Sequence, residues 1–238
     1  MFELFKRPRV RIEVPRLKPR EVSESLPRVN LAELTPELLP YLGQAAYIQL
    51  SLFEALARVV TVAPTVQAKE ALFPAAGQAL KKHQKLVAEI RRRVDEPAVI
   101  MEPFVPAIDN FAALVQGADW YESLTSIYLT AGILDDFFVL LAAGIAGDAG
   151  TRAAEIMDAE SGRQVIVTLL TDAITEDPPL GSRLALWGRR LVGDTLLVAR
   201  SAIHHTDNAR TDEQRIEPAF TELIAQHSRR MDALGLTA

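Results

Sequence analysis

The sequence predicts an all-α fold, in which a four-helix bundle with one long crossover is followed by two additional C-terminal helices. Three observations lead to this prediction. Apolar residues recur at helical spacing almost throughout the chain after Asn30. No segment alternates convincingly with a period of two, and the short run RVRIEV near the N-terminus would form at most an edge strand. Prolines and glycines divide the helical pattern into segments, with the longest gap between the second and third.

The first two segments predict a helical hairpin. Helical periodicity covers residues 36–62 and 65–94, and Pro64 separates the two. We expect Thr35 to cap the first helix, because a threonine side chain accepts a backbone hydrogen bond there and a proline suits the first turn that follows. Pro97 lies just past the second helix and cannot continue it.

The next segments predict a second hairpin. The long connection after Val94 contains three prolines, and we expect a short helix in it at residues 109–115. The third main helix begins at Asp119 and ends in the glycines of GIAGDAG, and the fourth covers residues 151–174. Two hairpins joined by one long crossover have the connectivity of ferritin-like bundles.

Two amphipathic helices follow the second hairpin. They are expected at residues 181–203 and 211–234. The second of them starts with Thr-Asp-Glu-Gln, a capping box in which Thr211 and Gln214 would bind each other's backbone N–H groups. We expect both helices to pack on the outside of the bundle.

Charge separates an N-terminal arm from the rest of the chain. The formal net charge is −5, yet residues 1–20 contain seven Lys or Arg residues and only two acidic ones. Prolines within this segment oppose a helix. We therefore expect an extended basic arm at residues 1–30 and a single ferritin-like helical domain at residues 31–238. The arm suits either tRNA or another polyanion, or the acidic surface of its own bundle or of a sister subunit.

Composition excludes several classes of protein. The chain has no cysteine, which excludes disulfides, thiol catalysis and thiolate metal sites. The N-terminus lacks the apolar core and cleavage site of a signal peptide. The longest apolar run, residues 124–146, is interrupted by Asp135 and Asp136, so we expect no membrane span and a cytoplasmic location.

Two segments resemble a known family. The sequences DWYESLTSIYLTAGILDDFFVLLA (119–142) and RLALWGRRLVGD (183–194) are similar to MiaE-like ferritin-like proteins, relatives of tRNA-modifying hydroxylases. With the spacing of the four main helices, the resemblance covers roughly residues 38–203. It implies a carboxylate-bridged di-iron centre, activation of O₂ and hydroxylation of a modified adenosine in tRNA.

The ligands of such a centre are incomplete in this chain. The bundle pattern requires one Glu from each of two helices and a Glu-x-x-His motif from each of the other two. Gln49 stands where one Glu is expected, Leu80 precedes His83 by three residues, and Arg163 follows Glu160 by three residues in place of His. The residues expected at one level of the bundle, the candidate former metal-site cavity, are Gln49, Leu80, His83, Asp135, Asp136, Glu160 and Arg163.

Two readings of this cavity follow. In the first, no metal binds and a buried polar network takes its place: His83 faces the interior near Gln49 and Arg163, and Asp135 or Asp136 pairs with Arg163. In the alternative, iron is held by His83, Asp135 and Glu160.

Four residues at the start of the third helix are candidates for lining a cavity. Trp120, Tyr121 and Tyr128 would stack on an adenosine or pack in the core, and Glu122 would line the cavity or favour the helix start through the dipole. No residue is assigned a catalytic role.

Two functions remain open on the sequence. The first is a binding or assembly module of unknown cellular role, without an intact di-iron centre and forming a homodimer or other homo-oligomer. The alternative is an iron-dependent hydroxylase, a non-haem monooxygenase acting on a modified tRNA nucleoside. The iron content of the purified protein separates them.

Overall fold

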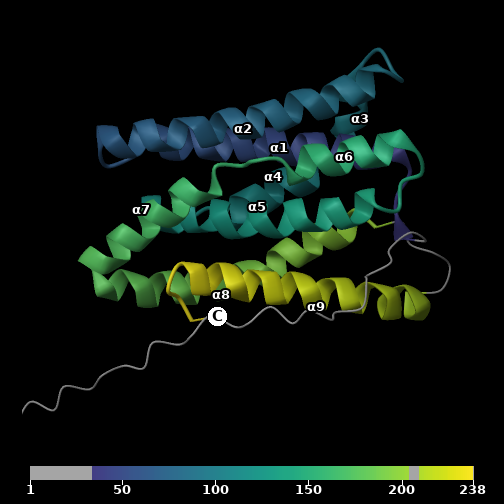
Figure 1. Cartoon of the computed structure of the whole chain (residues 1–238). Helices are drawn as coiled ribbons and strands as arrows, with labels where there is room; N and C mark the ends of the chain where they lie inside the picture. The colour runs from purple at the N-terminus through teal and green to yellow at the C-terminus, as the bar shows by residue number, and fades with distance from the viewer. Residues whose placement is uncertain (1–33, 204–208, 238) are drawn as a thin grey trace, which may run out of the picture.

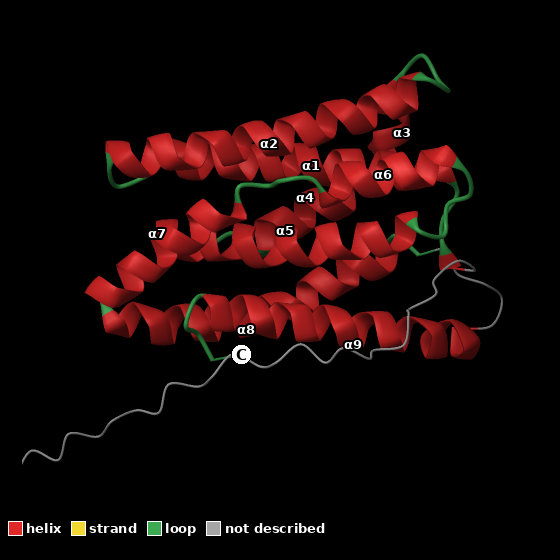
Figure 2. Ribbon diagram, viewed as in Figure 1, coloured by secondary structure: helices red, strands yellow, loops and turns green. Residues whose placement is uncertain are grey.

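The computed structural model describes residues 34–203 and 209–237. The predicted arm, residues 1–30, lies outside the described residues, and so do its expected contacts. The described residues are almost entirely helical, and no strand occurs among them, so the all-α prediction is confirmed (Figure 2). The elements in chain order are α1 (Leu38–Thr61), α2 (Val66–Arg91), α3 (Pro97–Met101), the 3₁₀ helix η2 (Glu102–Phe104), α4 (Val105–Leu114), α5 (Trp120–Ala142), α6 (Asp148–Asp158), α7 (Arg163–Glu176), α8 (Pro178–Ser201) and α9 (Ala209–Ala233).

The bundle has the predicted connectivity. Helices α1 and α2 form an antiparallel hairpin, and the segment from α3 to α4 crosses the bundle so that α5 runs in the same direction as α2 (Figure 1). Helices α6 and α7 return along α5 and complete the bundle, while α8 and α9 pack against α5. The crossover is more helical than predicted, because α4 covers Val105–Leu114 rather than residues 109–115.

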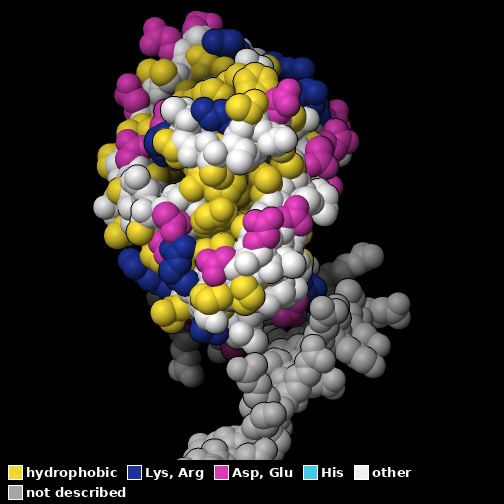
Figure 3. Space-filling model, turned by 90° about the vertical axis from the view of Figure 1, so that its left-hand side faces the viewer, with side chains coloured by type: hydrophobic (Ala, Val, Ile, Leu, Met, Phe, Trp, Pro, Cys, Tyr) yellow, Lys and Arg dark blue, Asp and Glu magenta, His cyan; other side chains and the backbone are white. Residues whose placement is uncertain are grey.

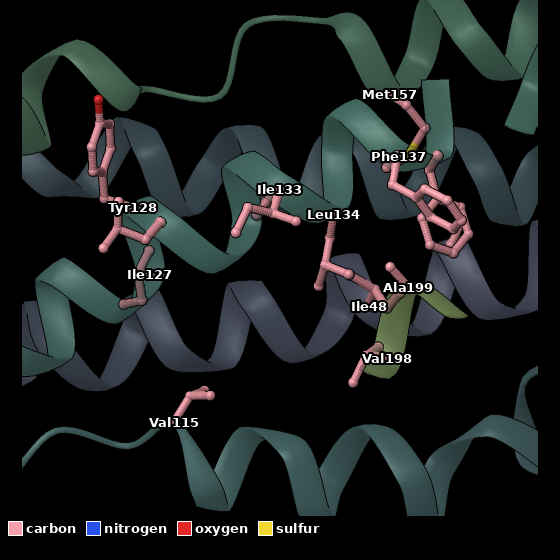
Figure 4. Packing of buried hydrophobic residues seen from close by; sticks show 14 of the residues in the cluster. Ile48, Val115, Ile127, Tyr128, Ile133, Leu134, Phe137, Met157, Val198 and Ala199 are labelled. Carbon is pink, nitrogen blue, oxygen red and sulfur yellow. The ribbon is translucent and has the colours of Figure 1, made fainter. Parts of the chain in front are cut away.

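Helix α5 is the core of the molecule. It contacts α1, α6, α7, α8 and α9, and side chains on all its faces are buried. Figure 4 shows Ile133, Leu134 and Phe137 of α5 packed among Met157 of α6 and Ala199 of α8. Among the described residues, α5 alone is long and apolar enough to cross a membrane, and 78% of its most apolar window is buried in the bundle. Burial in the core therefore accounts for its composition.

The starts of three helices differ from the prediction. Thr35 does not cap α1; its hydroxyl donates to the Leu141 carbonyl, and Glu37 holds the N-cap position. Helix α8 begins at Pro178, because proline fits the first position of a helix, rather than at residue 181. Helix α9 begins at Ala209, so the expected capping box at Thr211 lies within its first turn.

The predicted helix at 151–174 is two helices. Helix α6 ends at Asp158 and α7 begins at Arg163, and Gly162 between them has φ +72°. A Cβ atom on Gly162 would lie 2.6 Å from Cβ of Ala75 in α2. The glycine therefore provides both the left-handed conformation and the close approach of the two chain segments. This break decides where Glu160 and Arg163 lie.

Candidate functional site

A buried carboxylate lies where the helices of the bundle meet. Asp135, in the middle of α5, is 1% exposed. Its Oδ1 accepts a hydrogen bond from Gln49 Nε2 of α1 at 2.9 Å. Its Oδ2 accepts from Lys82 Nζ of α2 at 2.9 Å and from Arg163 Nη2 of α7 at 2.8 Å. We call these four residues the Asp135 cluster.

Lys82 connects the cluster to a fifth helix. The residue is 2% exposed, and its ammonium also donates to the Met157 carbonyl of α6 at 2.7 Å. A buried ammonium is costly unless it is paired and hydrogen-bonded, and here both conditions hold. Arg163 differs, because 35% of its side chain is exposed to solvent. The cluster thus contains one carboxylate and two cationic groups, of which only the lysine is fully buried.

Sequence reasoning missed Lys82. Helix α2 buries Leu72, Ala75, Ala79, Lys82 and Leu86, a stripe at spacings of three and four residues. His83, the next residue, was expected at the inward position after Ala79, because it too fits an apolar stripe with Ala79 and Leu86 at spacings of three and four residues. The regular spacing of the buried residues includes Lys82 and could have indicated it. Pairing with Asp135 offsets the free-energy cost of burying the ammonium group.

His83 does not join the Asp135 cluster, which corrects the expectation that it faces Gln49 and Arg163. It is half-buried, and its Nδ1 lies 2.9 Å from the Ala46 carbonyl of α1. Because a carbonyl only accepts, Nδ1 carries the proton in this contact. His83 therefore links α2 to α1 by a hydrogen bond, whereas the preceding residue, Lys82, reaches Asp135. Leu80 is half-buried and is not among the hydrogen-bonded residues of the cluster.

The remaining ligand candidates are also dispersed. Glu160 is exposed in the break between α6 and α7, where its Oε1 accepts from the Gly162 N–H at 2.6 Å. Asp136 pairs with Arg230 of α9, on a different face of α5 from Asp135. The alternative set of His83, Asp135 and Glu160 is therefore not brought together. Within residues 34–203 and 209–237, no three His, Asp or Glu side chains are grouped closely enough to hold a metal ion.

A cavity of about 390 Å³ lies beside the cluster, between α1, α4 and α5. Gln49 is one of its lining residues, so this side chain belongs to both the cavity and the Asp135 cluster. Most of the lining is apolar; it includes Ile48, Leu52, Ile108, Phe111, Ile127 and Leu134.

The four predicted cavity-lining residues are not part of this lining, which corrects that expectation. Trp120 Nε1 donates to the Val59 carbonyl of α1 at 2.9 Å, and the Tyr121 ring stands edge-on to the indole. Glu122 accepts from Arg183 of α8 at 2.7 Å. Tyr128 is buried on another side of α5 from Ile127 (Figure 4), and burial raises the pKa of its hydroxyl. These side chains join helices to one another.

Comparison with protein families agrees with the fold. A family model described as a ferritin-like domain of actinomycetes matches residues 35–211, about three quarters of the chain. The chain belongs to this ferritin-like domain family. A search of curated proteins gave no match. The match in this ferritin-like domain covers α1 to α8 and stops at the start of α9, so the Asp135 cluster lies within it.

The cluster does not fit the di-iron centre that other ferritin-like bundles hold. Such a centre needs four carboxylates and two histidines converging from four helices. In this ferritin-like domain, the residues that converge are one carboxylate, one amide and two cations. The Lys82 ammonium and the Arg163 guanidinium both donate to Asp135 Oδ2, and neither group is a metal ligand while protonated.

Proposed function

We propose that this ferritin-like protein works without a di-iron centre, as a binding module. The observation that supports the proposal is the pairing of Asp135 with Lys82 and Arg163 at the centre of the bundle. Removing one partner of a buried ion pair leaves an uncompensated charge, which costs about 3–5 kcal/mol. The cluster is thus a structural substitute for the metal that bridges the helices in related bundles.

The alternative is a hydroxylase of the MiaE-like type acting on tRNA. The residues that carry this resemblance contact one another: Trp187 Nε1 of α8 donates to Ser126 Oγ of α5 at 2.8 Å, and Arg183 pairs with Glu122. These contacts support a shared way of packing α8 on α5. These packing contacts do not require that the two proteins share a chemistry. Among the described residues, no group of His, Asp or Glu side chains suited to holding iron favours the hydroxylase.

Metal content separates the two functions. The protein is expressed in iron-supplemented cells, purified without chelators and analysed by inductively coupled plasma mass spectrometry. The proposal predicts well below one iron per chain, because Asp135 is neutralised by protein cations. About two iron atoms per chain, with the absorption of a carboxylate-bridged pair, would establish the alternative instead.

A homodimer in the cytoplasm also stays a proposal. Two leucines on one face of α8, Leu186 and Leu197, are each 68% exposed, as in a surface that a second subunit would cover. Sedimentation velocity tests this directly: the dimer should dissociate in a Leu197→Lys variant. Contact of the basic arm with tRNA stays a prediction of the sequence.

A further inference from the structure

The exposed hydrophobic side chains of the described residues include two groups. One lies at the end of the bundle that Figure 3 views, where Val62 and Val66 flank the turn between α1 and α2. The other lies along α8, where Leu186 and Leu197 are each 68% exposed. Exposed apolar patches mark interaction sites. On α8, the residues between the two leucines indicate what covers them.

One face of α8 is an exposed stripe with leucine at both ends. Residues at successive spacings of four, three and four positions lie on one face of a helix. Four exposed residues of α8 follow this spacing, and we call them the α8 stripe: Leu186, Arg190, Gly193 and Leu197. Asp194 lies four residues after Arg190, so the two charges are on the same flank of the stripe.

The α8 stripe is complementary to a second copy of itself. The midpoint between Leu186 and Leu197 and the midpoint between Arg190 and Asp194 lie less than one residue apart. A two-fold axis through this point would lay a second α8 antiparallel on the first, with the same flank of both helices on one side. Each Leu186 then meets Leu197 of the second copy, and each Arg190 meets its Asp194.

The two charges are not paired within the chain. Among the described residues, the Asp194 side chain has no hydrogen-bond or ion-pair partner, and Arg190 has no carboxylate partner. The Arg190 guanidinium lies 5.2 Å from the centre of the Trp187 ring, which holds it on the surface of α8. Arg189, on the opposite flank, donates to the Thr237 carbonyl at 2.9 Å and is thus directed to its own chain. Arg190 and Asp194 therefore remain available to a partner with the opposite charges.

The glycine of the stripe also suits a close neighbour. A Cβ atom on Gly188 would lie 2.5 Å from Met231 Sδ, so the packing of α9 accounts for that glycine. A Cβ atom on Gly193 would have no described atom within 4 Å. Glycine destabilises the interior of a helix and permits close approach of another chain. A second α8 crossing at the middle of the stripe would make use of Gly193.

We propose that two copies of this chain form a dimer in which their α8 helices pack antiparallel about a two-fold axis near Val192. Leu186 packs on Leu197 of the second copy, and Arg190 forms an ion pair with its Asp194. The inference rests on the homodimer proposed above, and it adds the surface, the direction and the register of the contact.

Disulfide cross-linking tests the direction and the register. The chain contains no cysteine, so the variants Leu186→Cys and Leu197→Cys each carry a single thiol. In a mixture of the two variants the thiols face each other, whereas two copies of Leu186→Cys hold theirs about 16 Å apart along the helix, beyond the reach of a disulfide. We expect oxidation with copper phenanthroline to cross-link the mixture at least about tenfold faster than either variant alone.

Mass spectrometry identifies which variants are joined in the cross-linked product. A product that contains one copy of each variant supports the antiparallel register. Equally fast cross-linking of Leu186→Cys alone, or no cross-linking of the mixture, would overturn the inference.

Charge reversal tests the ion pair. Asp194→Arg brings like charges together and should raise the dissociation constant of the dimer, measured by sedimentation equilibrium, at least about tenfold. Asp158→Arg, the same change at an exposed position of α6, is the control and should leave the constant unchanged. Combining Asp194→Arg with Arg190→Asp exchanges the signs of both partners and should recover most of the affinity. An equal effect in Asp158→Arg, or a double variant that binds no more tightly than Asp194→Arg, would contradict the pairing.

The proposals fail by different measurements. A protein that sediments as a monomer would overturn the homodimer together with this inference, and would leave the metal-free bundle standing. A dimer that keeps its affinity in Asp194→Arg and does not cross-link in the mixture would overturn this inference alone. Iron bound at the centre would overturn the metal-free function whatever the cross-linking gives.

Discussion

At the residue scale, the ion pair between Lys82 and Asp135 stabilises the centre of the bundle. Both side chains are buried, whereas Arg163 reaches solvent. We expect Lys82→Met to destabilise the protein by about 3–5 kcal/mol, because the methionine fills the space but leaves Asp135 with too little compensating charge. Arg163→Leu should cost less, since water screens that pair. Urea denaturation measures both. Lys81→Met, an exposed substitution on the same helix, is the control; an equal loss in Lys81→Met and Lys82→Met would contradict the account.

We expect His227 to make the stability of the protein depend on pH. It is 3% exposed, neither ring nitrogen has a hydrogen-bond partner, and burial together with nearby Arg230 lowers its pKa from 6.5 to about 4. The unfolded chain therefore binds this proton more readily than the folded protein. We therefore expect this contribution to stability to be complete above about pH 6.5 and to fall as the pH drops toward 4, by up to roughly 3 kcal/mol.

The variant His227→Leu should show a shallower loss of stability over the same range. Denaturation curves of the variant and the original protein between pH 7 and pH 4, fitted to the free energy of unfolding, provide the comparison. Parallel pH profiles would show that the histidine does not contribute.

Part of the site could be predicted residue by residue. The inward position of Gln49 follows from helical spacing, and the need to neutralise a buried charge predicts that Arg163 pairs with Asp135 or Asp136. The structure shows that the partner is Asp135. Helical spacing could not show that Lys82 is buried in preference to His83, because the two residues are adjacent in α2 and both lie near its inward face. Only the positions of Asp135 and the Met157 carbonyl make the lysine the better residue to bury.

At the scale of the elements, the break between α6 and α7 positions Arg163. Gly162→Ala would place a side chain in a left-handed conformation and against Ala75 of α2. We expect a loss of about 2 kcal/mol or more. Gly77→Ala is the matched control, because that glycine lies in α2 with open space around it. The control should gain about 0.5–1 kcal/mol, since alanine favours a helix.

Differential scanning calorimetry of the Gly162→Ala and Gly77→Ala variants measures both expected changes in stability. A Gly162→Ala protein as stable as Gly77→Ala would mean that the break does not need the glycine. The sequence did not predict this break, because apolar residues keep helical spacing on both sides of it and an isolated glycine is tolerated within a helix. The contact with Ala75, a residue distant in sequence, is what makes the break necessary.

At the scale of the whole molecule, connectivity was predictable and exact helix ends were not. The long connection between α2 and α5 makes these helices parallel, and this brings the middle of each main helix to one level (Figure 1). That arrangement made the position of the site predictable without any knowledge of its chemistry. Thr35 shows the limit: its hydroxyl reaches the Leu141 carbonyl, a tertiary contact that local capping rules do not anticipate.

We propose that the Asp135 cluster, and not a metal, holds the helices of the bundle together. Thermal unfolding tests it most directly, with the protein melted anaerobically in excess Fe(II) and, separately, in a chelator. A metal bound only to the folded state at 100 times its Kd adds about 2.7 kcal/mol, which corresponds to roughly 5–10 °C for a protein of this size. We predict melting temperatures that agree within about 1 °C. A rise of several degrees in Fe(II), reversed by the chelator, would contradict the account.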